Sequence, residues 1–224
     1  PVPVNTMLRA EDYKYLVTDS ACAGLIYSKI FSKTIKRAIK EADYKPKNIL
    51  SAENLRNAAA ALSTELAFSI NSHLDDCFWL YSSGSTGKPK GVVHPHRSMV
   101  CTSERFAKNT VGLNENDTVF SASKLFHSYG FGNAMTFPLW VGATIVLSDR
   151  KVTPKMSFEM IKQFRPTVFF GVPTLYAQQL RAMETEKPDL SSLRICVSAG
   201  EALPGDVFRR WQEKTDTLII DGLG

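Results

Sequence analysis

The sequence contains no apolar stretch that approaches the roughly 20 residues needed for a membrane-spanning helix. Its start, PVPVNTMLRAEDYKYL, lacks the basic-then-apolar layout of a secretory signal. Its 4 cysteines form no C-x-x-C pair, which argues against a disulfide framework or a zinc knuckle and favours reduced, buried thiols. We therefore expect a cytoplasmic protein without a membrane span.

A strong charge of one sign is also absent. The net charge is +5 over 224 residues, and no continuous basic face with interleaved aromatic residues can be found, so we expect no nucleic-acid partner. Positive charge is concentrated only at Lys88, Lys90, His94, His96 and Arg97. A local cluster of this kind favours a small anionic ligand.

Short runs of apolar and β-branched residues recur along the chain, whose hydrophobic share of 44% is ordinary for a globular protein. The runs are AGLIYS (23–28), KNILS (47–51), CFWLY (77–81), DTVFSA (117–122), ATIVLS (143–148), PTVFFG (166–171), LRICVSA (193–199) and DTLIID (216–221). Segments with helical spacing of apolar residues lie between runs, for example at 156–164 and 175–183. The alternation predicts an α/β fold: a largely parallel β-sheet, covered by helices on both faces, with ligands at the carboxyl ends of its strands.

The segment SSGSTGKPKG (82–91) follows the CFWLY run. Its glycines let backbone amides turn toward an anion, its hydroxyls add hydrogen-bond donors, and its lysines add positive charge. This composition predicts a polyphosphate site, with a flexible surface turn as the alternative interpretation. The G-x-x-x-x-G-K-[ST] loop of kinases and GTPases is excluded, because Gly87 and Lys88 are followed by Pro89 and not by Ser or Thr.

The same segment closely resembles the [ST]-S-G-[ST]-T-G-x-P-K-G signature of the adenylate-forming superfamily, which includes the AMP-binding acyl-CoA synthetases. Four further segments resemble later motifs of that family in the same order: SKLFHSYGFGNAMTFPLWVGATIVL (123–147), PTVFFGVPTLYAQQL (166–180), SSLRICVSAGEALP (191–204) and DTLIIDGLG (216–224). The similarity covers nearly the whole chain. It is greatest to the benzoate-CoA ligases and other aryl-CoA ligases.

The resemblance implies a loop for the ATP phosphates, made of Ser83, Gly84, Ser85, Thr86, Gly87 and Lys90. It also implies two catalytic residues, Thr86 in contact with phosphate and His127 beside the reacting carboxylate. His127 would orient the carboxylate or gate the site and would not act as a base, because a carboxylate is already ionised at neutral pH. A structural, hydrogen-bonded histidine is the alternative interpretation.

The resemblance assigns two further groups of residues. The acyl pocket consists of Phe126, Ser128, Tyr129, Gly130 and Gly132, and the adenine and AMP site of Gly200, Glu201, Ala202, Asp221, Gly222 and Leu223. We expect Phe131 to be a core residue instead. Glu201 has a second interpretation, as an acidic residue at the entry of a helix near Pro204.

Two positions depart from the K-L-F-F-A-Y-G sequence that is common in the benzoate branch. His127 and Ser128 would make the pocket wall more polar, which favours a hydroxylated or amino-substituted benzoate. Leu223 stands where the family commonly has an aromatic residue stacked on adenine. We interpret 94–96 (HPH) as a loop before a helix that starts at Ser98, and we expect no metal ligand in this chain.

The implied reaction belongs to aromatic acid metabolism. An aromatic carboxylate reacts with ATP and Mg²⁺ to form an acyl-adenylate, from which coenzyme A takes the acyl group as a thioester. In the family, the Mg²⁺-binding Thr-Glu, a hinge and a C-terminal domain follow the last segment matched here. We therefore expect residues 1–224 to be a single incomplete AMP-binding domain that is inactive alone.

Two other functions remain open. The first is an adenylation enzyme that loads a carrier-protein thiol, and the second is a non-catalytic nucleotide-binding fragment. The oligomeric state is also open, a homo-oligomer included.

Overall fold

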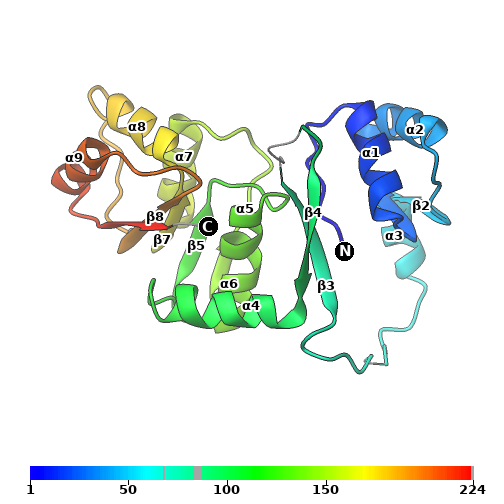
Figure 1. Cartoon of the computed structure of the whole chain (residues 1–224). Helices are drawn as coiled ribbons and strands as arrows, with labels where there is room; N and C mark the ends of the chain where they lie inside the picture. Colours follow the sequence, from blue (N-terminus) through cyan, green and yellow to red (C-terminus); the bar gives the residue numbers. More distant parts are fainter. Residues whose placement is uncertain (68, 83–86, 223–224) are drawn as a thin grey trace. The chain divides into compact units, whose positions relative to one another are not determined.

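The computed structural model describes residues 1–67, 69–82 and 87–222 (Figure 1). The chain divides into two compact units, a smaller one of Asn5–Asn71 and a larger one made of Pro1–Val4 and Ser72–Gly224. The single domain expected for residues 1–224 stays a prediction. In the described ranges, no helix combines the length and apolar character that a bilayer crossing requires.

The smaller unit consists of helices and one pair of strands: α1 (Ala10–Ser20), β1 (Gly24–Tyr27), η1 (Lys29–Phe31), α2 (Ser32–Glu41), β2 (Asn48–Ser51) and α3 (Ala52–Ala59). Strands β1 and β2 pair in parallel, as expected from the runs at 23–28 and 47–51. Helices α1 and α2 pack against each other, and each buries one face. In α1, Leu16 and Val17 lie three and four residues after the buried Tyr13, and in α2 the buried Ile35 and Ala38 are three residues apart. Most side chains of β1 and β2 are not buried, so the expected coverage of both faces is wrong for these two strands.

The larger unit contains a five-stranded sheet in the order β6-β5-β7-β8-β9. Its strands are β5 (Thr118–Ser121), β6 (Thr144–Val146), β7 (Val168–Gly171), β8 (Ile195–Ala199) and β9 (Ile219–Gly222). All neighbouring strands pair in parallel. The parallel sheet expected from the apolar runs is thereby confirmed.

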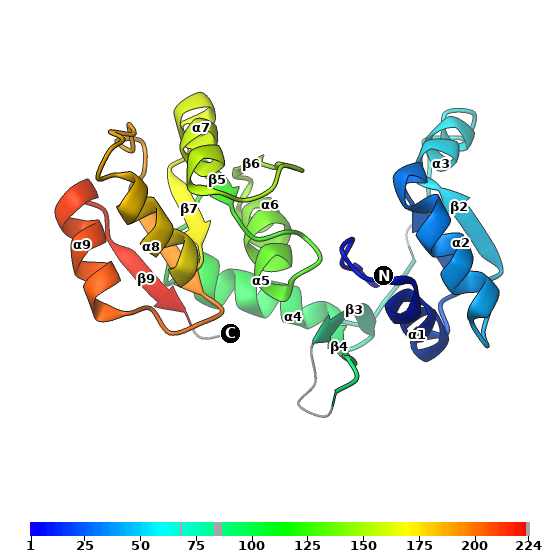
Figure 2. The ribbon, with the colours of Figure 1, turned by 90° about the horizontal axis from the view of Figure 1, so that it is seen from above.

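Helices cover both faces of this sheet (Figure 2). They are π-helical η2 (Ser103–Lys108), α5 (Ser128–Phe131), π-helical η3 (Gly132–Thr136), α6 (Phe137–Val141), α7 (Pro154–Phe164), α8 (Pro173–Ala182) and α9 (Gly205–Thr215). Helix α4 (His96–Thr102) leads directly into η2. Phe169 and Cys196 face a core completed by α7, α8 and α9, whereas Phe170 and Val197 face the core on the opposite side. In β7 and β8, successive side chains therefore alternate between two buried faces, which explains the largely apolar sequences of these strands.

The helix boundaries follow from local chemistry. The hydroxyl of Thr153 accepts the amide hydrogen of Met156 at 3.1 Å, and Pro154 occupies the first position of α7, whose amide needs no partner. Pro173 begins α8 in the same way. Pro204 is the residue that directly precedes α9.

The CFWLY run forms no part of the parallel sheet. It lies in β3 (Asp76–Ser82), which pairs antiparallel with β4 (Lys90–Pro95) in a hairpin. The interpretation of 94–96 as a loop is therefore wrong, because His94 and Pro95 end a strand, and α4 begins at His96, two residues before the expected start. Val92 and Val93 are exposed, so β4 lacks the buried apolar run by which the other strands were found.

An ion pair between a buried carboxylate and a partly exposed arginine joins strands at the amino edge of the sheet. The carboxylate of Asp117 is 4% exposed and accepts two hydrogen bonds from Arg194, at 2.8 and 2.6 Å. The hydroxyl of Thr167 donates to it at 2.6 Å and the amide of Asn114 at 3.0 Å. Burial alone would raise the pKa of Asp117, but these hydrogen bonds outweigh it and lower that pKa below its usual value.

Candidate functional site

The predicted site residues that the structure describes in the sheet region lie along its carboxyl edge. Residues 126–127 follow β5, residues 200–202 follow β8, and Asp221 and Gly222 end β9. Parallel strands share one carboxyl edge, so segments about 100 residues apart in sequence meet there. The acyl and adenine segments of the sequence analysis are therefore brought to one edge.

The acyl segment begins with a tight turn before α5. His127 is the residue that precedes α5, with an extended backbone, and its amide donates to the carbonyl oxygen of Lys124 at 3.0 Å. The rings of Phe126 and His127 lie side by side, with centroids 4.5 Å apart. This turn presents both rings at the edge of the sheet.

Two glycines of the acyl segment are required by close packing. A methyl group at Gly130 would overlap the carbonyl oxygen of Lys124 and would lie 2.8 Å from that of Ser123. At Gly132, the same group would lie 2.9 Å from the ring of Phe137. Only glycine allows α5 and η3 to approach these groups so closely.

His127 and Ser128 are exposed. Partial burial lowers the pKa of His127 below its ordinary value, so the imidazole is mainly neutral at pH 7. A neutral imidazole can donate one hydrogen bond and accept another.

Tyr129 connects the acyl segment to the strand that carries the adenine segment. Its hydroxyl donates to the carbonyl oxygen of Val197 in β8 at 3.1 Å, and its ring meets Phe170 edge-on. The hydroxyl of Tyr176 donates to the same carbonyl oxygen at 2.9 Å. Burial raises the pKa of Tyr129 well above its usual value, so its phenol keeps its proton and acts as a donor.

The adenine segment is held by strand pairing and one side-chain hydrogen bond. Ser198 lies opposite Asp221, and Ala199 lies opposite Gly222. The carboxylate of Asp221 accepts the amide hydrogen of Leu203 at 3.2 Å. Asp221 is thereby tied to the loop after β8.

The loop after β8 starts at Gly200, whose φ of +93° is a conformation that favours glycine. Glu201 and Ala202 are exposed beside it. The acidic residue in the first turn of α9 is Asp206, so the interpretation of Glu201 as a helix-entry acid is wrong. Leu223, predicted beside the adenine, lies outside the described residues.

The phosphate segment belongs to the β3–β4 hairpin. Gly87 has a φ of +95°, and Lys90 is exposed at the start of β4, opposite Ser82. The other predicted phosphate-binding residues lie outside the described residues: Ser83, Gly84, Ser85 and Thr86.

An aromatic contact attaches the hairpin to the acyl segment. The ring of Phe78 in β3 lies 4.6 Å from that of Phe131 in α5, and it also stacks on the ring of His94 at 4.7 Å. Phe131 is buried there, which confirms the prediction that it is a core residue. The structure therefore joins the hairpin that carries the predicted phosphate segment to the acyl segment, and joins the acyl segment to the strand that precedes the adenine segment.

Metal-ligating side chains do not gather in the part of the chain that the structure describes. No group of 3 or more His, Cys, Asp or Glu side chains comes together within these ranges. His94, which the HPH sequence offers as a ligand, stacks on Phe78 instead.

Comparison with known families decides what this edge belongs to. The sequence profile described as AMP-binding enzyme matches residues 1–224, the whole chain. The chain belongs to the AMP-binding enzyme family.

Individual relatives are aryl-CoA ligases. The benzoate-CoA ligase of Thauera aromatica is 42% identical over 228 residues, an alignment that covers 100% of this chain and 43% of that protein. A crystal structure of a benzoate CoA ligase from Burkholderia xenovorans LB400 matches with a TM-score of 0.88 and 38% identity, covering 100% of this chain and 45% of that one. The anthranilate CoA ligase AuaEII in complex with anthranoyl-AMP matches with a TM-score of 0.92 and 34% identity, covering 99% and 43%. The chain thus spans less than half the length of these relatives.

Two features of this AMP-binding enzyme's edge were missed by sequence analysis. Strand β7 lies between β5 and β8, so the turn 171–173 at its end lies between the acyl and adenine segments. The sequence analysis predicted a strand at the PTVFFG run, but it did not predict the strand order, which puts β7 in the middle of the sheet. Lys124 was also missed, and only the folded chain shows what its side chain contacts.

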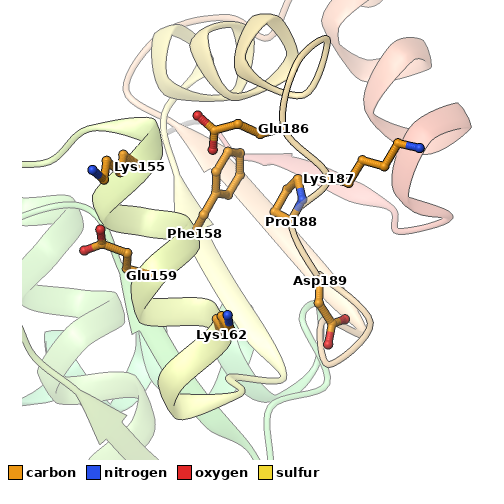
Figure 3. Close-up of a pocket in the computed structure, with 8 residues that line it drawn as sticks. All are labelled: Lys155, Phe158, Glu159, Lys162, Glu186, Lys187, Pro188 and Asp189. Carbon is orange, nitrogen blue, oxygen red and sulfur yellow. The ribbon is translucent and has the colours of Figure 1, made fainter.

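A surface pocket of about 370 Å³ does not belong to this edge (Figure 3). Four residues of α7 and the segment 186–189 line it, and that segment leads into the amino end of β8. Its charged residues have both signs: Lys155, Glu159, Lys162, Glu186, Lys187 and Asp189. Among the predicted site residues that the structure of this family member describes, none lines the pocket.

Proposed function

We propose that the whole protein is an AMP-forming acid-thiol ligase, which activates a benzoate-like carboxylate with ATP and transfers the acyl group to coenzyme A. The observation that carries the proposal is the hydrogen bond from Tyr129 to Val197, which unites the acyl and adenine segments at one edge. An acid and a nucleotide must meet at such a place to form an acyl-adenylate. The similarity to aryl-CoA ligases over the whole chain supports the choice of acid.

The first step joins the two substrates. A carboxylate oxygen attacks the α-phosphorus of ATP, the bond from that phosphorus to the bridging oxygen breaks, and pyrophosphate leaves. In this proposal Thr86 and Lys90, with Ser83, Gly84, Ser85 and Gly87, hold the departing phosphates. Mg²⁺, when bound, neutralises part of their charge.

The acid is held by the turn before α5 and the first residues of that helix. His127 is neutral at pH 7 and donates a hydrogen bond to the carboxylate without removing a proton, since none has to be removed. Phe126, Ser128, Tyr129, Gly130 and Gly132 form the wall around the ring. The polar His127 and Ser128 favour a hydroxyl or amino substituent on the acid.

The nucleotide lies against the adenine segment, formed by Gly200, Glu201, Ala202, Asp221, Gly222 and Leu223. In the second step the thiol sulfur attacks the acyl carbon, the bond to AMP breaks, and the thiol proton passes to solvent. The acceptor is the property that separates a CoA ligase from a carrier-protein loading enzyme. We also propose a cytoplasmic location, which fractionation of cells would test. Light scattering would measure the oligomeric state.

Carboxylate-dependent ATP–pyrophosphate exchange by the full-length protein tests the activity. Benzoate, hydroxybenzoates, aminobenzoates, acetate and a medium-chain fatty acid are compared, and thioester formation is then measured with coenzyme A and with a carrier protein. Exchange with an aryl acid and thioester formation with coenzyme A are expected. ATP binding without exchange for any acid would favour the non-catalytic alternative.

A pair of lysine variants tests the phosphate role. Lys90→Met removes a charged donor from the hairpin and is expected to lower the exchange rate about tenfold to a hundredfold. Lys162→Met is the matched control, because Lys162 lines the pocket on α7 and not the carboxyl edge. Equal activities of the two variants would contradict the assignment of Lys90.

A further inference from the structure

Lys124 joins two loops at the carboxyl edge. It lies after β5, and its ammonium group donates hydrogen bonds to the carbonyl oxygens of Ser148 and Arg150, each at 2.7 Å. Strands β5 and β6 are parallel neighbours, so the loops that leave their carboxyl ends run next to each other. A single charged group therefore fastens the segment 148–150 to the segment that leads to α5. Hydrogen bonds from a charged donor are stronger than those between neutral groups.

The backbone of the same residue supports the acyl turn. Its carbonyl oxygen accepts the amide hydrogen of His127 at 3.0 Å, and Gly130 lies so close to it that no side chain fits between. A displacement of Lys124 would therefore displace the start of α5 and the ring of His127. The side chain anchors one loop, and the main chain anchors the other.

The neighbouring cation Arg150 makes a different contact from that of Lys124. Arg150 uses its guanidinium to pair with Glu159 in α7 at 2.6 Å. Lys124 itself is half-buried, and this burial lowers its pKa while the Asp149 carboxylate opposes the effect. Two of the three ammonium hydrogens point to backbone carbonyls at short distance. This geometry indicates that the Lys124 ammonium group anchors the backbone and does not bind a substrate anion.

We propose that Lys124 is a positioning residue for the aromatic acid: by holding the 148–150 segment against the acyl turn, it keeps Phe126 and His127 in the geometry that binds the carboxylate. The inference rests on the function proposed above. It predicts a selective effect, because the tether supports the acyl turn and makes no hydrogen bond with the adenine segment among the described residues.

The kinetic test compares Lys124→Met with Lys162→Met in the full-length protein. In ATP–pyrophosphate exchange, Lys124→Met is expected to raise the KM for the aromatic acid about tenfold or more and to leave the KM for ATP within about twofold. Lys162→Met is expected to change neither. A general loss of stability would affect both substrates, so an equal rise in both KM values would overturn the positioning role.

Chemical rescue distinguishes the effect of losing the ammonium group of Lys124 from the effect of changing the volume of its side chain. Treatment of the Lys124→Cys variant with 2-bromoethylamine restores an ammonium group on a side chain of nearly the length of lysine. This treatment is expected to lower the raised KM for the aromatic acid most of the way back to the wild-type value. Wild-type protein treated in parallel controls for alkylation of the native cysteines, 4 of which lie within these 224 residues. A treated variant that stays as impaired as the untreated one would contradict the tether.

Amide hydrogen exchange tests the tether without any activity. In Lys124→Met, peptides covering 122–131 and 147–153 are expected to exchange faster than in wild type, and those covering α9 to be unchanged. Unchanged exchange in both loops would refute the tether, whatever the kinetics. If wild type is active and the loops loosen but the KM for the acid is unchanged, the positioning role is refuted. Inactivity of wild type with every acid would refute the proposed function and the positioning role, and the exchange data would still decide the tether.

Discussion

Replacing Gly130 with alanine places a methyl group against atoms that cannot rotate away. The new carbon would overlap the carbonyl oxygen of Lys124 and lie 2.6 Å from its carbonyl carbon and 2.8 Å from the carbonyl oxygen of Ser123. All three are backbone atoms of the loop after β5, which Lys124 also ties to the segment 148–150. Relief requires a shift of α5 or of that loop.

The expected size follows from two opposing effects. Overpacking a close-packed site costs about 1–3 kcal/mol, and a clash with fixed backbone belongs at the upper end of that range. Alanine is a better helix former than glycine by about 1 kcal/mol, which acts in the opposite direction. We expect a net loss of about 2 kcal/mol in the free energy of unfolding, together with a raised KM for the aromatic acid.

Gly205→Ala is the matched control. Gly205 is the first residue of α9, and a methyl group there would come no closer than 3.8 Å, to the end of the Arg209 side chain. This variant should be neutral or more stable by up to about 1 kcal/mol, because alanine restricts the unfolded chain. Urea denaturation of the full-length variants, with exchange kinetics, measures both effects. A Gly130→Ala protein as stable as Gly205→Ala would refute the close packing of α5 on its preceding loop.

Further predictions concern hydrogen bonds that connect distant segments. Asp117→Asn removes the charge that pairs with Arg194, whose side chain is partly exposed, and should destabilise the protein by about 2 kcal/mol in urea denaturation at pH 7. Because folding lowers the pKa of Asp117, its stabilising contribution is present above about pH 4 and is lost as pH falls through the folded-state value. The variant should therefore show a smaller loss of stability on acidification than wild type, and equal acid sensitivity would contradict the ion pair's role. Tyr129→Phe keeps the ring but removes the donor to Val197, so we expect about 1 kcal/mol less stability and a higher KM for the acid, and unchanged values of both would count against the link between β8 and α5.

Local pattern explains where sequence-based prediction succeeded. The runs at 166–171 and 193–199 became β7 and β8, since strands buried on both faces need apolar side chains at every position. The same criterion could not find β4, whose Val92 and Val93 are exposed and whose end is Pro95. That strand exists because β3 pairs with it, and pairing is a property of two segments.

The candidate site likewise has features that the sequence indicated and features that only the folded chain shows. The sequence motif singled out His127, Tyr129 and Asp221 without knowledge of their positions. It could not indicate that Tyr129 donates to a carbonyl oxygen 68 residues further along the chain, because any residue at that position has the same carbonyl group. Lys124 escaped notice for a related reason, since its partners are backbone oxygens, which carry no sequence signature.

The sequence by itself determined the α/β class, the individual strands of the parallel sheet and the family, because apolar period, turn chemistry and motif order are local properties of the chain. Tertiary structure alone decided the strand order, the antiparallel hairpin and the contacts that unite the acyl and adenine segments. These depend on which backbone groups meet across the fold. Backbone hydrogen-bonding groups are common to nearly all residues, so their partners are chosen by packing and not by residue type.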